Sequence, residues 1–83
     1  MNTPLTFHVH YFGLLADRRG LGEESIQSTA RTAAELYAEI NARYPMDMQT
    51  ADFRAVVNDA FVPWDEPVHN EDRVAFLPPM SGG

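Results

Sequence analysis

The sequence predicts an α+β domain in which a mixed sheet of about five strands is covered by one main helix. Three observations predict this class. Apolar and polar residues alternate from Leu5 to Tyr11, a helix-start signal stands at Thr32, and short apolar runs from Ala55 to Leu77 are separated by turn residues. Because 83 residues provide one modest core, we expect a single domain.

The first two strands are expected near the N-terminus. Residues 5–11 have the period of a half-buried strand. Residues 13–22 are rich in glycine and charge and are interpreted as a polar loop. Residues 24–28, centred on Ile26, are expected to form a second strand and to pair with the first as a hairpin.

The main helix has a clear start and a clear end. Thr32 and Glu35 form a capping box, in which both side chains can accept hydrogen bonds from free N–H groups of the first turn. Apolar residues then recur at helical spacing as far as Tyr44. Pro45 disfavours helical backbone at the residue before it, so we expect the helix to end at Tyr44.

The remaining strands lie in the second half of the chain. After an irregular segment, 46–52, the short strands 55–57 and 61–62 are expected to flank a tight turn at Asn58-Asp59-Ala60. A loop with prolines leads to the last strand, residues 73–77.

This order of elements is compatible with several α+β topologies. In one of them the first and last strands lie side by side at the centre of the sheet, which is the β-grasp, or ubiquitin-like, fold. We expect one domain over residues 1–77, which the resemblance described below implies to be a β-grasp domain, followed by a flexible, extended functional tail over residues 78–83, which ends in Gly-Gly.

Composition excludes several classes of function. The net charge of −6 disfavours nucleic acid as a partner and favours a partner with a basic docking surface. No apolar run is long enough to span a membrane, and no secretion signal is recognisable. The sequence has no cysteine, so disulfides are excluded and a cytoplasmic location is expected.

The tail offers a chemically distinctive group. Pro78 and Pro79 cannot continue a sheet ladder, so they are expected to end the strand and direct the chain away from the domain. The residues from Met80 to Gly83 can reach roughly 13 Å when extended. Without side chains, Gly82 and Gly83 can enter a narrow channel and deliver the α-carboxylate of Gly83.

That carboxylate must be activated before it can transfer an acyl group, for example as a mixed anhydride with AMP. The sequence contains no phosphate-binding glycine loop, metal cluster or nucleophile–base pair that would activate it. We therefore expect the protein to be the substrate and carrier of another enzyme. The alternative is a frayed terminus without a function.

Two further groups of residues are candidates for binding. If the strands keep their alternation, Phe12, Phe61 and Leu77 point away from the helix and form an apolar docking patch; the alternative is that some of them cover the edge of the core. His8 and His10 lie on one face of a strand, but without an identifiable third ligand they are interpreted as a solvent-facing pair, and no metal site is expected.

Three segments carry a resemblance to a known family: "HVHYFGLLADRRG", "AVVNDAFV" and "NEDRVAFLPPMSGG". Together they resemble the small subunits of molybdopterin synthase, which are ubiquitin-like sulfur carriers related to the thiamine-pathway carrier. The Pro-Pro pair before Gly-Gly favours the molybdopterin branch. The departures are Gly13, where alanine is common, and Leu77, where a second phenylalanine often stands.

The resemblance implies a carrier function. A ubiquitin-activating-type adenylyltransferase would use ATP to adenylate Gly83, and a sulfur donor enzyme would convert the carboxylate to a thiocarboxylate. The large subunit of molybdopterin synthase, which holds the catalytic residues, would accept the tail, and the sulfur would pass to a cyclic pyranopterin precursor of the molybdenum cofactor. The carrier would bind no cofactor itself. The residues implied in partner binding are Phe12, Phe61, Leu77, Pro78, Pro79, Met80 and Ser81.

Two alternatives stay open. One keeps the sulfur chemistry but serves another pathway: thiamine, cysteine or a tungsten-pterin. The other is a ubiquitin-like interaction domain or protein modifier whose tail is never thiolated.

Overall fold

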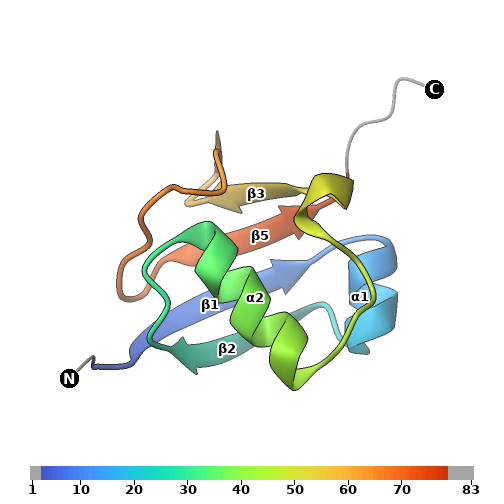
Figure 1. Ribbon diagram of the computed structural model, residues 1–83, viewed down its shortest axis with the longest axis horizontal. Coiled ribbons are helices and arrows are strands. Elements are labelled where there is room, and N and C mark those ends of the chain that lie inside the picture. Colours follow the sequence, from blue (N-terminus) through green and yellow to red (C-terminus); the bar gives the residue numbers. More distant parts are fainter. Residues whose placement is uncertain (1–2, 79–83) are drawn as a thin grey trace.

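The computed structural model describes residues 3–78. These residues form a five-stranded sheet with one long helix across one face (Figure 1). The elements are β1 (Leu5–Tyr11), α1 (Leu14–Arg19), β2 (Glu23–Ser28), α2 (Ala33–Arg43), a 3₁₀ helix η1 (Thr50–Asp52), β3 (Arg54–Val57), β4 (Ala60–Val62) and β5 (Arg73–Leu77). Within the described residues, no helix combines the length and hydrophobicity needed to span a bilayer.

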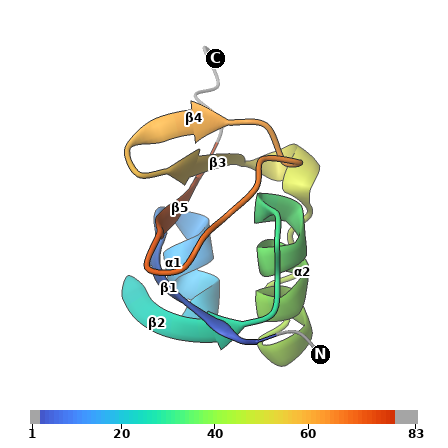
Figure 2. The ribbon, with the colours of Figure 1, turned by 90° about the vertical axis from the view of Figure 1, so that its left-hand side faces the viewer.

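The sheet has the strand order β2-β1-β5-β3-β4. The first and last strands, β1 and β5, are parallel neighbours at its centre, whereas all other neighbouring strands are antiparallel. Seen from the side in Figure 2, the sheet and α2 form two layers. The predicted β-grasp arrangement is therefore confirmed.

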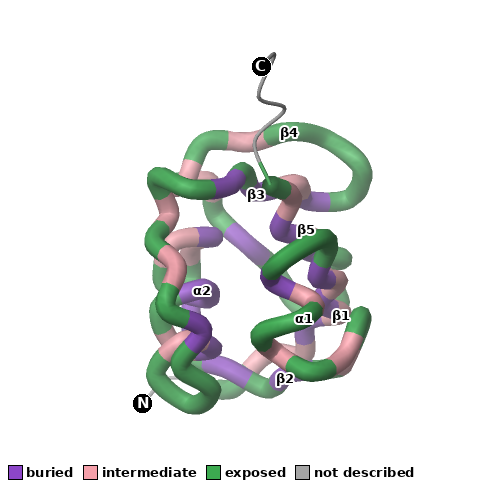
Figure 3. Tube along the Cα trace, turned by 90° about the vertical axis from the view of Figure 1, so that its right-hand side faces the viewer, coloured by how far each residue is buried: buried purple, intermediate pink, exposed green. Residues whose placement is uncertain are grey.

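The core lies between the sheet and α2. Val9 of β1 and Phe76 of β5 are fully buried beneath Leu36 and Ile40 of α2, and the buried segments face each other across this layer in Figure 3. An aromatic cluster fills the end of the core near β3; its members are Tyr37, Phe53, Trp64 and Phe76. Alternating strand residues and the apolar stripe of α2 thus meet as the two periodicities predict.

The predicted capping box of α2 is formed in part: the Thr32 hydroxyl accepts as predicted, but the Glu35 carboxylate accepts from the residue before the N-cap and not from Thr32 itself. The backbone N–H of Glu35 donates to the Thr32 hydroxyl at 3.2 Å, and the backbone N–H of Arg31 donates to the Glu35 carboxylate at 2.8 Å. The helix ends at Arg43, and Tyr44 is its C-cap, directly before Pro45. Both boundaries follow from local sequence signals.

The prediction of a loop over residues 13–22 is wrong, because this segment contains the helix α1. The helix is short and lies between two glycines with positive φ, Gly13 and Gly20. Its side chain Leu15 is buried in the core, with 1% of its surface exposed. A six-residue helix is too short to show a helical period in the sequence, and burial of Leu15 supplies the stabilisation that local propensity does not.

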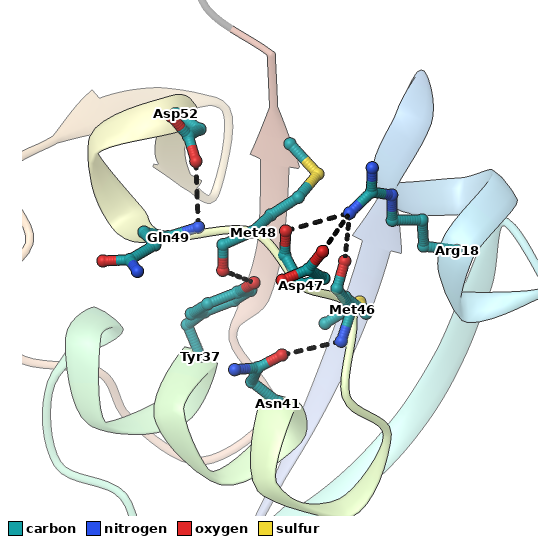
Figure 4. A network of polar contacts seen from close by, with 8 residues as sticks. All are labelled: Arg18, Tyr37, Asn41, Met46, Asp47, Met48, Gln49 and Asp52. Atoms are coloured by element: carbon teal, nitrogen blue, oxygen red, sulfur yellow. Dashed lines mark hydrogen bonds and ion pairs between the residues drawn. The ribbon is translucent and has the colours of Figure 1, made fainter.

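The segment before η1 is held by side chains from both helices (Figure 4). Arg18 of α1 donates to the backbone carbonyls of Met46 and Asp47 at 2.8 and 2.9 Å. Tyr37 of α2 donates its hydroxyl hydrogen to the carbonyl of Met48 at 2.6 Å. Long-range hydrogen bonds therefore fix a segment for which the sequence predicts no regular structure.

A second polar contact fastens α1 to the sheet. Arg19 donates two hydrogen bonds of 2.7 Å to the Glu24 carboxylate, and Tyr11 donates a third of 2.7 Å. The guanidinium also stacks 3.6 Å from the ring centroid of Tyr44. Burial raises the pKa of Glu24, but the hydrogen bonds from Arg19 and Tyr11 outweigh burial and bring the pKa below its ordinary value.

The substitution Glu24→Gln is expected to destabilise the domain by about 1–3 kcal/mol at neutral pH, because it removes the charge that Arg19 pairs with. Since the folded-state pKa of Glu24 is lowered, its contribution is present above the unfolded pKa and is lost as the pH falls through the folded pKa. Urea unfolding at neutral and at acid pH measures this effect. The control is Glu23→Gln, at an exposed neighbour that we expect to matter little. If Glu24→Gln lowered the free energy of unfolding by the same amount at both pH values, the stabilisation would not come from the charge of Glu24.

Candidate functional site

The candidate site begins where β1 and β5 end, at the same end of the sheet as α1 (Figure 1). β5 ends at Leu77, and the next residue, Pro78, is exposed. The other predicted tail residues lie outside the described residues: Pro79, Met80, Ser81, Gly82 and Gly83. What the structure places is therefore the root of the tail and the surface around it.

The sheet face opposite α2 carries an apolar surface beside this root. Phe61 pairs with Val56, Val56 pairs with Ala75, and Leu77 pairs with Arg54. Because residues paired across strands share a face, Phe61, Val56 and Ala75 form one row, and Leu77 follows Ala75 along β5. We call this surface the outer apolar face; it consists of Phe12, Val56, Phe61, Ala75 and Leu77.

Exposure differs among the three residues that the sequence singles out. Phe61 is 68% exposed and Phe12 is 44% exposed, whereas Leu77 is half-buried. Phe12 borders a shallow depression of about 200 Å³ that Val56 and Ala75 also line. The structure therefore brings Phe12 and Phe61 to one face as large exposed apolar side chains, with Leu77 as a partly covered neighbour.

Sequence reasoning missed one exposed apolar side chain near this surface. Leu14, the first residue of α1, is 47% exposed, whereas its neighbour Leu15 is buried. The pair Leu14-Leu15 was the sequence signal for this exposure. Consecutive residues of a helix point in different directions, so when one of them is buried its neighbour can face solvent. Leu14 directly follows Phe12 and Gly13 in the chain, at the end of the sheet where β1 leads into α1.

Charged side chains surround the outer apolar face. Arg73 pairs with Asp59 at 3.0 Å, His8 lies 2.6 Å from Glu71, and His10 lies 3.4 Å from Glu23. Both histidines are partly exposed on the face opposite α2. Among residues 3–78, no cluster of three or more histidine, aspartate or glutamate side chains is placed to hold a metal ion.

The perturbed titratable groups lie away from this face. Burial raises the pKa of Tyr11 and of Tyr37. A hydrogen bond from Ser28 lowers the pKa of Glu39, which also pairs with Arg43 at 2.5 Å. These groups stabilise the contacts of the two helices with the rest of the domain. The described part of the site is thus an exposed apolar surface next to the root of the tail.

A comparison with protein families finds that a model of the ThiS family matches residues 9–83. The matched range includes the outer apolar face and the tail as far as Gly83. A comparison with curated proteins finds no significant match.

Several solved structures are similar to this chain. A candidate molybdopterin converting factor subunit 1 from Pyrococcus furiosus is 27% identical, with a TM-score of 0.78 and coverage of 92% of this chain and 99% of that chain. In a complex of subunits 1 and 2 of molybdopterin-converting factor from Helicobacter pylori, the matching chain is 22% identical, with a TM-score of 0.64 and coverage of 95% and 100%. The small archaeal modifier protein 1 from Haloferax volcanii is 15% identical, with a TM-score of 0.79 and coverage of 92% and 99%. The last two structures, at 22% and 15% identity, show only that their fold is similar to the fold of this chain.

Proposed function

This chain belongs to the ThiS family of ubiquitin-like sulfur carriers, and from this membership we propose that it is the small subunit of a molybdopterin synthase. The observation that carries the proposal is that the family match continues through the tail to Gly83. The Pro-Pro pair before Gly-Gly, and the 27% identity with the candidate molybdopterin converting factor subunit 1 from Pyrococcus furiosus, support this branch of the family.

In the proposed cycle, Gly83 is the carboxyl terminus and carries the sulfur. A ubiquitin-activating-type adenylyltransferase joins the Gly83 carboxylate to AMP with release of pyrophosphate from ATP. A sulfur donor enzyme then supplies sulfur at the oxidation level of sulfide, which displaces AMP from the acyl carbon and leaves a thiocarboxylate. The large subunit of the synthase accepts the charged tail, the sulfur passes to a cyclic pyranopterin precursor, and water restores the Gly83 carboxylate. The catalytic residues belong to the partner enzymes.

The described surface supports docking beside the tail. Phe12 and Phe61 expose large apolar side chains on one face, and the root of the tail at Pro78 adjoins it. Exposed aromatic side chains are frequent anchors of protein interfaces, and a partner that covers this face would receive the tail in the same encounter. The net charge of −6 favours a partner with a basic rim around its apolar contact.

A protein-modifier function is the second candidate. The fold likeness to small archaeal modifier protein 1, with a TM-score of 0.79, is as close as the likeness to the converting factor subunit, with a TM-score of 0.78. The fold therefore does not separate the two functions. A carrier for thiamine, cysteine or a tungsten-pterin would also share the tail chemistry.

Intact mass spectrometry of the protein from its native cells, without reductive or acidic work-up, tests the proposal. We expect a population heavier by the difference between one sulfur and one oxygen, with the added mass on Gly83. Deleting the gene should also abolish molybdenum-cofactor formation in the same cells.

Three other outcomes would point elsewhere. A thiocarboxylate combined with normal molybdenum-cofactor formation would assign the carrier to another pathway. An isopeptide bond between Gly83 and a lysine of another protein would favour a modifier. A plain carboxylate that stays unchanged with ATP and the activating enzymes of the cell would refute the sulfur-carrier function.

A further inference from the structure

Arg54 borders the outer apolar face beside the root of the tail. It is the first residue of β3 and pairs with Leu77, the last residue of β5, so the two side chains lie on the face opposite α2. Figure 1 shows the start of β3 beside the end of β5. Val56, two residues further along β3, lies on the same face. A charged side chain therefore stands next to apolar side chains that the proposed function expects a partner to cover.

The charge of Arg54 is available to a partner. The side chain is exposed. The other five arginines each donate a side-chain hydrogen bond to an acceptor within residues 3–78: Arg18, Arg19, Arg31, Arg43 and Arg73. Arg73 lies on the same face as Arg54, but its charge is paired with Asp59 at 3.0 Å. Within these residues, Arg54 is thus the arginine whose guanidinium has no hydrogen-bond or ion-pair partner.

Arg54 also borders a depression of about 260 Å³ at the edge of the sheet, whose lining includes Thr50, Val62 and Trp64. The lining combines a guanidinium and a hydroxyl with apolar surface. This combination suits a carboxylate carried on an apolar stem, because the guanidinium donates to the carboxylate while the stem contacts the apolar lining. The depression therefore offers room for one acidic side chain of a partner.

A partner that covers the outer apolar face would also remove water from Arg54. A buried guanidinium without a counter-charge is strongly unfavourable, whereas a carboxylate accepts two parallel hydrogen bonds from it. The partner therefore has to supply an anion at this point. The net charge of −6 favours basic groups around the rest of the contact, so this anion would be a local exception that sets the register of the complex.

We propose that Arg54 is a partner-binding residue, which pairs with a glutamate or aspartate side chain of the adenylyltransferase that activates Gly83. The inference rests on the proposed function, since it needs a partner enzyme that covers the outer apolar face. Arg54 touches no reacting atom. It orients the carrier on the enzyme, because a planar two-point pair is directional.

The expected effect is on binding and not on the chemical step. For Arg54→Ala, we expect the KM for the carrier to rise roughly 30-fold or more at unchanged kcat, since truncating one member of a buried charge pair leaves the other unpaired. Arg54→Glu should raise the KM further, by on the order of another tenfold, because two carboxylates would face each other. The experiment measures AMP formation at varied carrier concentration with the purified activating enzyme.

Ala42→Asp is the matched control for charge. It changes the net charge by the same amount as Arg54→Ala, but at an exposed position of α2 in the opposite layer. It should keep the wild-type KM. If the wild type is active but Arg54→Ala matches Ala42→Asp in KM, the inference alone fails. If no activating enzyme acts on the wild type, the proposed function fails and the inference fails with it.

Arg54→Lys gives a direct readout and keeps the charge if Arg54→Ala does not fold. Because the sequence contains no lysine, the variant has one side-chain amine. A carbodiimide joins an amine to a carboxylate at ion-pair distance with loss of water. Mass spectrometry should find an amide bond between residue 54 and a glutamate or aspartate of the enzyme. Ala42→Lys, which places the amine on α2, should give no such bond. An absent cross-link from residue 54, at enzyme and carrier concentrations above the KM, would overturn the inference.

Discussion

A variant without Gly82 and Gly83 should lose sulfur loading completely and unfold at the wild-type temperature. Its carboxylate would stand on Ser81, about 7 Å short of the position that Gly83 reaches in an extended tail. The Ser81 side chain would also have to enter a channel that suits glycine. Mass spectrometry of the protein after incubation with ATP, the activating enzyme and the sulfur donor measures loading, and thermal unfolding measures stability.

The control for this variant is Ala42→Asp, which changes an exposed side chain of α2 but keeps the length of the tail and its Gly-Gly end. It should still be loaded. A truncated protein that complements a gene deletion in cells as well as the wild type does would show that the tail carries no cargo. The domain would then act as a pure interaction module.

Replacing Phe61 by aspartate is expected to raise the KM of the activating enzyme for the carrier at least about 30-fold, since loss of an interface hot spot costs ~2 kcal/mol or more. Among residues 3–78, Phe61 is the most exposed of the large apolar side chains, at 68%, and it stands in the outer apolar face. The substitution places a charge where a partner would bury an aromatic ring. The fold should tolerate it, because the side chain contributes little to the core.

The matched control is Ala42→Asp, which adds the same charge at an exposed position of α2, in the layer opposite the outer apolar face. This variant should keep the wild-type KM, while its melting temperature should fall by a few degrees, because aspartate has a lower helix propensity than alanine and its charge opposes the helix dipole in the last turn of α2. Unfolding of Phe61→Asp would assign Phe61 to the core, and an unchanged KM would remove the outer apolar face from the docking model. Circular dichroism and steady-state kinetics on the same preparations separate these results.

The sequence predicts the strands and the main helix well because their signals are local. Alternation over residues 5–11 and the N-cap at Thr32 each involve side chains a few residues apart, and both appear in the structure. The helix α1 has no comparable signal. It forms because Leu15 enters a core built by distant segments, so a reading of residues 13–22 by themselves suggests a loop.

The candidate site divides in the same way. The order of Pro78, Pro79, Gly82 and Gly83 is covalent, so the sequence by itself predicts which group could be carried and that another enzyme would activate it. The exposed fraction of each side chain in the site could not be predicted from the sequence. Alternation predicts that Leu77 points away from α2, but only packing decides that it is half-buried and that Leu14 is exposed.

The position of Gly13 beside Pro78, where a Cβ atom on residue 13 would lie 3.2 Å from the proline ring, depends on tertiary structure entirely. The two residues are far apart in the chain, and they meet because β1 and β5 pair in parallel with one particular register. Parallel pairing needs a long crossover, so no local pattern specifies which residues become neighbours. The sequence determined the chemistry of the tail, and the folded sheet decided which residue lies beneath its root.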